Sequence, residues 1–192
     1  MKRKTNKILI YSVVIVVFVA LILFFFLSSG GNISSGVGTT GTASDGIAWM
    51  NVELTDVNSG DIFKVSEFRG KPVLLETFAV WCPTCTKQQR NLRKLHDTVG
   101  EDVISISLDV DPNEDEERVK EHTQNNGFNW RYSVAPIEMT KSLIDDFGAS
   151  IVSAPSSPMI LICEDGSFRK LGGFGARSAD KLQEEIARGC GG

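Results

Sequence analysis

Cysteine, proline and basic charge are all scarce in this chain of 192 residues. Four cysteines are too few for a fold held together by disulfides, so each has to be interpreted from its position. With 18 glycines and six prolines, the chain is neither collagen-like nor of low complexity. A net charge of −4 offers no basic surface to a nucleic acid. The 42% of hydrophobic and 23% of charged residues are ordinary for one globular domain, which excludes a mostly disordered chain and a polytopic membrane protein.

One long apolar run lies near the N-terminus. Residues 8–27 are 20 consecutive residues without a charge, and a helix of that length spans about 30 Å, the thickness of a bilayer's hydrocarbon core. Four basic residues precede the run, and none follows it before Lys64. We therefore expect residues 1–7 in the cytoplasm, a transmembrane signal-anchor over 8–27, and the catalytic domain on the extracytoplasmic face of the cytoplasmic membrane. A cleaved signal peptide is the alternative, although the run is long for one and no A-x-A site follows.

Residues 28–46 are mostly Ser, Gly and Thr and predict a flexible linker. The linker contains one glycosylation sequon, at Asn32. Four of the 20 basic residues precede the apolar run, so 16 remain against 24 acidic residues. The exported part therefore carries a charge of about −8, and its surface has no reason to bind anionic lipid.

The rest of the chain, residues 47–188 with a tail over 189–192, has the pattern of an α/β domain. Alternating patterns and apolar runs predict a hairpin over 52–64 and strands over 73–80, 103–108, 159–163 and 168–171. Helical periodicity predicts helices over 92–99, 111–119, 139–147 and 178–186. The helix predicted over 111–119 begins with Asp111, Pro112 and Glu114, which have the spacing of an N-cap, a first-turn proline and a capping-box partner. Parallel units followed by β-β-α predict a mixed central sheet with helices on both faces.

The chemistry lies in Trp81-Cys82-Pro83-Thr84-Cys85, between a buried strand and a helix. Cysteines at i and i+3 on a first helical turn bring their sulfurs within disulfide reach. The first of them lies at the helix N-terminus, where free N–H groups and the helix dipole favour the thiolate that attacks disulfides. We therefore expect Cys82 to attack and Cys85 to resolve the mixed disulfide.

Three other interpretations of the cysteine pair compete with this one. The cysteines could be core residues, but a chance C-x-x-C at a strand–helix junction is uncommon. A zinc site needs two further ligands, and neither the other two cysteines nor His96 and His122 have matching spacing, so no metal is expected. A static structural disulfide is the third, although so small a loop tends to be reducible.

This motif resembles that of the thioredoxin-like thiol–disulfide oxidoreductases. The stretch 66–75, the hairpin before it and Asp109-Val110-Asp111 are similar to the membrane-anchored TlpA/ResA-like branch, over roughly 47–188. The resemblance implies a thioredoxin-like fold with an N-terminal hairpin extension and no cofactor. It also implies exported client proteins with thiols or disulfides, including apocytochrome c, and recharging by an integral-membrane thiol electron carrier.

The resemblance further implies a cis-proline that faces the cysteine pair just before a strand. Pro158 stands eight residues before Gly166, the family's approximate spacing, whereas Pro155 stands eleven before it, so we choose Pro158. An ordinary trans-proline at a strand start is the alternative. The stretch 149–157 is longer than usual and predicts a local insertion. We expect the client to be contacted by residues around the pair and the proline, namely Trp81, Pro83, Thr84 and Ser157.

Glu76 precedes Cys82 by six residues, where many thioredoxins carry a buried acid that exchanges protons with the second cysteine. Burial would raise the pKa of such a carboxyl and make it a general base. Period-2 counting alone does not decide whether Glu76 faces the core or water. The family's usual Glu three residues after the second cysteine is Gln88 here, which argues against a relay through that position.

The sequence thus predicts a membrane-tethered enzyme that reduces protein disulfides. A disulfide-forming oxidant is the alternative, because Pro83 directly after the first cysteine is typical of the oxidising branch. A non-catalytic tethered binding module and a thiol peroxidase are further alternatives, but the peroxidase motif wants Pro and Thr where Leu75 and Ala79 stand. We expect Cys163 and Cys190 to lie outside the active pair; a bond between them is left open.

Overall fold

Five strands form the central sheet of the computed structural model, which describes residues 47–191. In sheet order they are β5 (Arg131–Val134), β4 (Ile104–Asp109), β3 (Val73–Phe78), β6 (Met159–Ile162) and β7 (Phe168–Lys170). β3, β4 and β5 run parallel, and β6 and β7 are antiparallel to their neighbours. The carboxyl ends of the three parallel strands therefore meet at one edge of the sheet, where the loops that carry chemistry usually lie.

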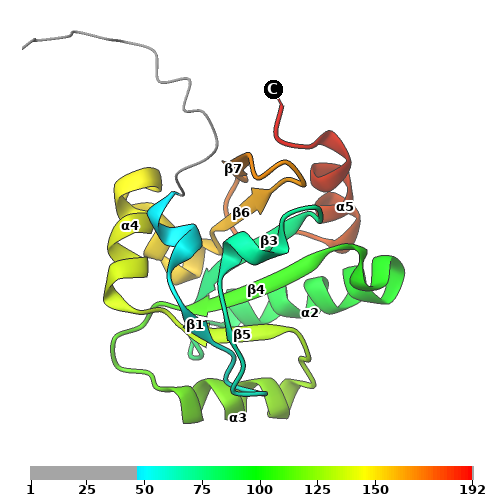
Figure 1. Cartoon of the computed structure of the whole chain (residues 1–192). Helices are drawn as coiled ribbons and strands as arrows, with labels where there is room; N and C mark the ends of the chain where they lie inside the picture. Colours follow the sequence, from blue (N-terminus) through cyan, green and yellow to red (C-terminus); the bar gives the residue numbers. More distant parts are fainter. Residues whose placement is uncertain (1–46, 192) are drawn as a thin grey trace, which may run out of the picture. The chain divides into compact units, whose positions relative to one another are not determined.

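Helices cover both faces of this sheet, as the sequence predicts (Figure 1). The first core cluster joins alternate side chains of β3, such as Leu74 and Phe78, to α2 (Pro83–Val99), α3 (Glu116–Asn126) and α5 (Ala179–Arg188). The second joins Val73 and Leu75 to α4 (Ile137–Phe147) on the other face. Every residue of β3 is buried, which explains why its sequence shows no alternation.

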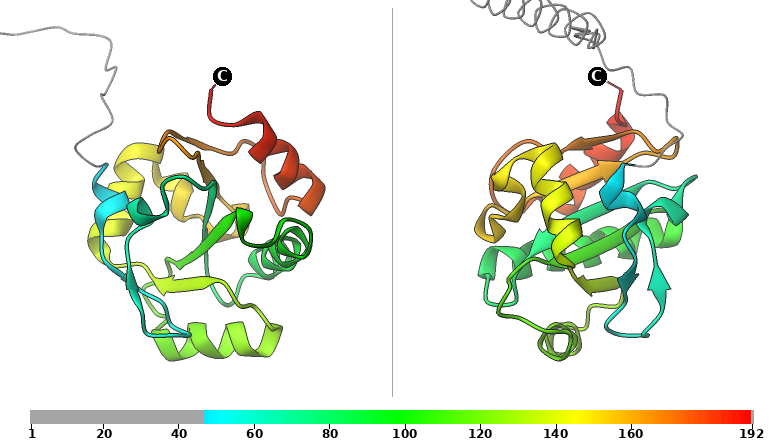
Figure 2. Two further views of the ribbon diagram at one scale, coloured as in Figure 1. Left: turned by 45° about the vertical axis from the view of Figure 1, so that its right-hand side comes forward. Right: turned by 60° about the vertical axis from the view of Figure 1, so that its left-hand side comes forward.

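The expected hairpin is present as β1 (Leu54–Thr55) and β2 (Ile62–Phe63), which pair antiparallel. It lies beside β5 (Figure 2), where the N–H of Val57 donates to the carbonyl of Tyr132 at 2.9 Å. The hairpin therefore covers the edge of the sheet that β5 would otherwise leave open.

Two elements differ from the sequence prediction. No strand was predicted over β5, because its buried residues, Tyr132 and Ser133, are adjacent rather than alternate. The third helix begins at Glu116 and not at Asp111, and Asp115 is its N-cap, accepting from the N–H of Arg118 at 2.9 Å. The predicted N-cap, Asp111, is therefore wrong. Several acidic residues lie close together in this segment, and the sequence pattern alone does not tell which of them caps the helix.

The predicted cytoplasmic segment 1–7, anchor 8–27 and linker 28–46 with its sequon at Asn32 lie outside the described residues. Among the helices of residues 47–191, none is both long enough and apolar enough to span a membrane.

Candidate active site

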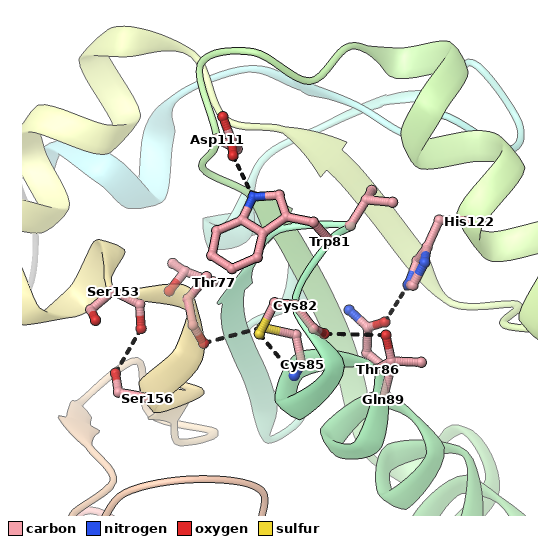
Figure 3. Close-up of a disulfide and its surroundings, with 12 residues drawn as sticks. Thr77, Trp81, Cys82, Cys85, Thr86, Gln89, Asp111, His122, Ser153 and Ser156 are labelled. Carbon is pink, nitrogen blue, oxygen red and sulfur yellow. Dashed lines mark hydrogen bonds between the residues drawn. A yellow bond between two sulfur atoms is a disulfide. The ribbon is translucent and has the colours of Figure 1, made fainter.

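Cys82 and Cys85 form a disulfide at the start of α2 (Figure 3). β3 ends at Phe78, and Cys82 is the N-cap of the helix, with Pro83 as its first residue. The Sγ of Cys82 accepts the backbone N–H of Cys85 at 3.1 Å. Because a sulfur that accepts a hydrogen bond at a helix N-terminus is stabilised as an anion, the geometry favours a thiolate on Cys82 in the reduced pair.

Exposure differs sharply between the cysteine pair and its neighbours in the chain. Both cysteines are 1% exposed, whereas Trp81 is 54% exposed. Pro83 is also exposed and Thr84 is half-buried. Trp81, Pro83 and Thr84, which we expect to contact the client, are therefore more accessible than the sulfurs, as are the half-buried Val80 and Thr86 on either side.

A loop after β4 supports the residues that lead into the pair. Asp111 accepts the indole N–H of Trp81 at 2.5 Å, and Glu114 accepts the backbone N–H of Val80 at 2.7 Å. Hydrogen bonds from Asn113 and then from Trp81 lower the pKa of Asp111. The sequence pattern predicts a helix start at these acids and gives no sign of this role, since only the parallel pairing of β3 with β4 brings the two loops together.

Glu76 faces the core on the α2 side of the sheet, which settles the orientation that the sequence left open. It is 1% exposed, and its Oε1 accepts the hydroxyl of Ser107 at 2.6 Å. Burial raises the pKa of Glu76 to about 7, against the lowering effect of Ser107 and Gln89. Gln89 lies one helical turn after Cys85, so the acid and the second cysteine are on the same side of α2.

The expected cis-proline is not found: every peptide bond in the described residues is trans, including the one before Pro158. Ser157 instead enters β6 with a φ of 47°. The carbonyl of Pro158 accepts the N–H of Thr77 at 3.3 Å, which pins this proline to the end of β3. The group against the pair is the carbonyl of Ala154, 3.1 Å from the Sγ of Cys85, a distance at which a reduced thiol can donate.

Ser157 is the one residue among the expected client contacts that is buried. Its N–H donates to Ala154, and its carbonyl accepts from Arg177. In this oxidised structure both backbone groups of Ser157 therefore already have partners, and its role in client binding stays a prediction. The insertion predicted over 149–157 folds as two short 3-10 helices, Ala149–Val152 and Ala154–Ser156.

Arg177 supports the loop beside the site, and the sequence prediction did not include it. Its guanidinium donates to the carbonyls of Ser157, Leu171 and Gly172 at 2.8–3.1 Å. Gln88, the residue in the family's usual glutamate position, accepts the backbone N–H of Arg177 at 2.6 Å. Gln88 therefore fastens a loop to α2. No sequence signal marks this link, because 89 residues separate its two ends.

The other two cysteines form a second disulfide, between Cys163 after β6 and Cys190 after α5. Cys163 follows the end of β6 that pairs with Val73, whereas the active pair lies beyond the other end of β3. The two disulfides are thus at opposite ends of the sheet. Among residues 47–191, no three His, Cys, Asp or Glu side chains come together as a metal site.

Comparison with known proteins agrees with this geometry. The Redoxin family model matches residues 43–172. The thiol-disulfide oxidoreductase ResA of Halalkalibacterium halodurans is 28% identical over 141 residues, covering 71% of this chain and 74% of that protein.

Solved structures share the fold at low sequence identity. A thioredoxin-family thiol:disulfide interchange protein from Chlorobium tepidum has a TM-score of 0.61 at 18% identity, covering 73% of this chain and 93% of its own. A secreted Mycobacterium tuberculosis disulfide oxidoreductase has a TM-score of 0.55 at 18% identity, covering 73% and 97%. This chain belongs to the Redoxin family, as a thiol–disulfide oxidoreductase with the thioredoxin-like fold of the TlpA/ResA-like branch.

Proposed function

We propose that the protein reduces disulfides of exported proteins while tethered to the outer face of the cytoplasmic membrane. The observation that supports this reaction is the capping geometry, in which the Sγ of Cys82 accepts a hydrogen bond from the N–H of Cys85 at the start of α2. The Cys82 thiolate attacks a client disulfide and releases one client thiolate. Cys85 then loses its proton to Glu76 and attacks the Sγ of Cys82, which releases the second client thiolate and forms the Cys82–Cys85 disulfide. Two electrons pass to the client.

The direction of electron flow rests on the charges around the pair. Strong oxidants of this chemistry owe their potential to a stabilised reduced thiolate. Here no charged residue lies between the cysteines, and Asp111 and Glu114 bind the two residues that precede Cys82. Arg118, 3.1 Å from Glu114, offsets part of this negative charge. The remaining charge opposes a further negative charge on Cys82 and favours a reducing pair.

The tether and its orientation are supported by the apolar run 8–27 and the basic residues before it. The Cys163–Cys190 bond adds support, because structural disulfides form mainly outside the cytoplasm. Recharging then requires an integral-membrane thiol electron carrier, and apocytochrome c is one client of this chemistry. In intact, mildly reduced cells, a membrane-impermeant maleimide should label Cys82. Labelling only after lysis would overturn the proposed orientation.

The reduction potential of the pair tests the direction. Equilibration of residues 47–192 with glutathione buffers should give a value well below that of strong periplasmic oxidants, about −120 mV. A value close to that figure would instead support the disulfide-forming alternative, which Pro83 favours. If the soluble domain fails to reduce insulin at any potential, the result would favour a non-catalytic binding module over both the reductant and the oxidant.

A further inference from the structure

Three buried polar side chains beside Glu76 have no part in the reaction described so far. Gln89 on α2 and Tyr132 on β5 are both 0% exposed, and His122 on α3 is 7% exposed. Within the described residues, the amide nitrogen of Gln89 and the hydroxyl of Tyr132 have no hydrogen-bond partner. Unpaired buried donors are costly, so two of them around one acid need an explanation.

His122 determines which end of the Gln89 amide faces the acid. Its Nε2 lies 2.7 Å from the Oε1 of Gln89, and an amide oxygen can only accept, so the ring donates (Figure 3). Stacking on Phe78, with ring centroids 5.8 Å apart, holds the imidazole in place. The amide nitrogen of Gln89 is therefore left to point away from His122.

The free donors lie within electrostatic reach of Glu76. Gln89 lowers the pKa of the Glu76 carboxyl. Ser107 on β4 is paired with Glu76 on one side and with Tyr132 on the other, so the three residues lie in one row across the same face of the sheet. Burial and then the negative charge of Glu76 raise the pKa of Tyr132, and Ser107 lowers it. Ser107 already donates to the Oε1 of Glu76 and itself accepts the indole N–H of Trp130 at 2.9 Å.

A base that works through proton transfer must exist in two charge states. Before Cys85 attacks, Glu76 is a carboxylate in a site with almost no access to water, and after the transfer it is a neutral acid. A buried carboxylate is stabilised chiefly by the hydrogen bonds that it accepts, and hydrogen bonds to charged groups are the stronger ones. Donors that stay unpaired while the acid is neutral would gain partners when it ionises.

We propose that Gln89, oriented by His122, and Tyr132 are positioning residues whose free donors bind the ionised form of Glu76 and so set the pH at which the resolving step can run. This assignment rests on the proposed role of Glu76 as the base. Neither residue touches the client or the sulfurs in this scheme; both act through the carboxyl.

Other ionisable groups on the surrounding elements bear on the same titration. They are Cys85 and Arg90 on α2, Asp109 on β4, His122 on α3 and Tyr132 on β5. Burial and then Arg90 lower the pKa of His122, so its ring is neutral at neutral pH. In the oxidised protein Cys85 has no proton to exchange, which leaves Asp109 as the acid that titrates nearby.

The test is the titration of Glu76 in the oxidised domain, followed by NMR of ¹³C-labelled glutamate carboxyls and assigned with Glu76→Gln. Gln89→Met should move the midpoint of Glu76 up by about one pH unit or more, since one donor to a charged group is lost. Tyr132→Phe should move it in the same direction. Gln88→Met is the matched control, because it removes an equally buried amide on the same helix that binds Arg177 instead.

An unmoved midpoint in Gln89→Met or in Tyr132→Phe would overturn the assignment of that residue. Tyr132→Phe keeps the test valid if Gln89→Met does not fold, because it removes only one hydroxyl. The rate of the resolving step against pH is then measured on the same variants. If the NMR midpoint moves while the rate profile stays in place, the donors are as inferred, and the proposed role of Glu76 as base is wrong.

Discussion

Single side chains decide the roles of the two cysteines. Cys85→Ser should accumulate a mixed disulfide between Cys82 and a client, because the attacking sulfur keeps its place at the helix N-terminus and the resolving one is gone. Cys82→Ser should accumulate none. Non-reducing gels of cell extracts, followed by mass spectrometry of the trapped peptide, show which cysteine is linked. Trapping through Cys85 in the Cys82→Ser protein would reverse the roles.

Glu76 also contributes to the dependence of stability on pH. Its pKa in the folded protein is about 7, above the ordinary value of 4.5, so the folded state holds its proton over a range where the unfolded chain has lost it. The contribution of Glu76 to stability therefore falls as the pH rises from about 4.5 to about 7, by up to about 3 kcal/mol.

Glu76→Gln should remove that loss. The variant should match the parent protein near pH 4 and exceed it in free energy of unfolding above pH 7.5, as measured by urea denaturation at both values. A pH dependence of at least similar size should persist in the variant, since burial also raises the pKa of Asp109 from 3.8 to about 7, with the carboxyl of Glu114 adding to it. Equal stabilities of the two proteins at high pH would contradict the assigned cause.

At the scale of elements, the junction of β3 with α2 was predictable and its supports were not. An apolar run, two cysteines three residues apart and a proline between them place a strand, a helix start and a reactive sulfur from local sequence alone. The partners of that junction come from far along the chain, as Asp111, Glu114 and Arg177 do. The face of Glu76 was undecidable for a related reason: both faces of β3 are buried, so no alternation tells them apart.

Arg177 tests the importance of such a distant support. It joins the end of β7 and the turn before β6 to α2, through three carbonyls and the side chains of Gln88 and Asn91. Arg177→Met should leave these carbonyls without their donor, cost about 2–3 kcal/mol of stability and slow client reduction. Arg188→Met is the control, because Arg188 is an exposed arginine of α5. This change should have little effect on stability or on client reduction. Thermal melts and insulin reduction at a temperature where both variants are folded provide the comparison.

At the scale of the whole described domain, the two disulfides have different roles at opposite ends of the sheet, one in the reaction and one in stability. The Cys163–Cys190 bond closes a segment that contains β7, the loop with Arg177, and α5. The same segment is also held by Arg169, which donates to Glu185 at 2.8 Å and to the carbonyl of Gly189 at 2.7 Å. Loss of the bond should therefore loosen the C-terminal end without releasing it, and the active pair should keep its environment.

The double variant Cys163→Ala, Cys190→Ala tests this division. A sequence separation of 27 residues predicts a loss of about 3.5 kcal/mol, because the unfolded chain regains the freedom of the closed loop. The midpoint of thermal unfolding should fall by several degrees. The potential of the Cys82–Cys85 pair and the insulin-reduction rate per folded molecule should stay the same. A changed potential in the folded variant would mean that the second disulfide exchanges with the first or shapes its surroundings, and that the two ends of the sheet are coupled.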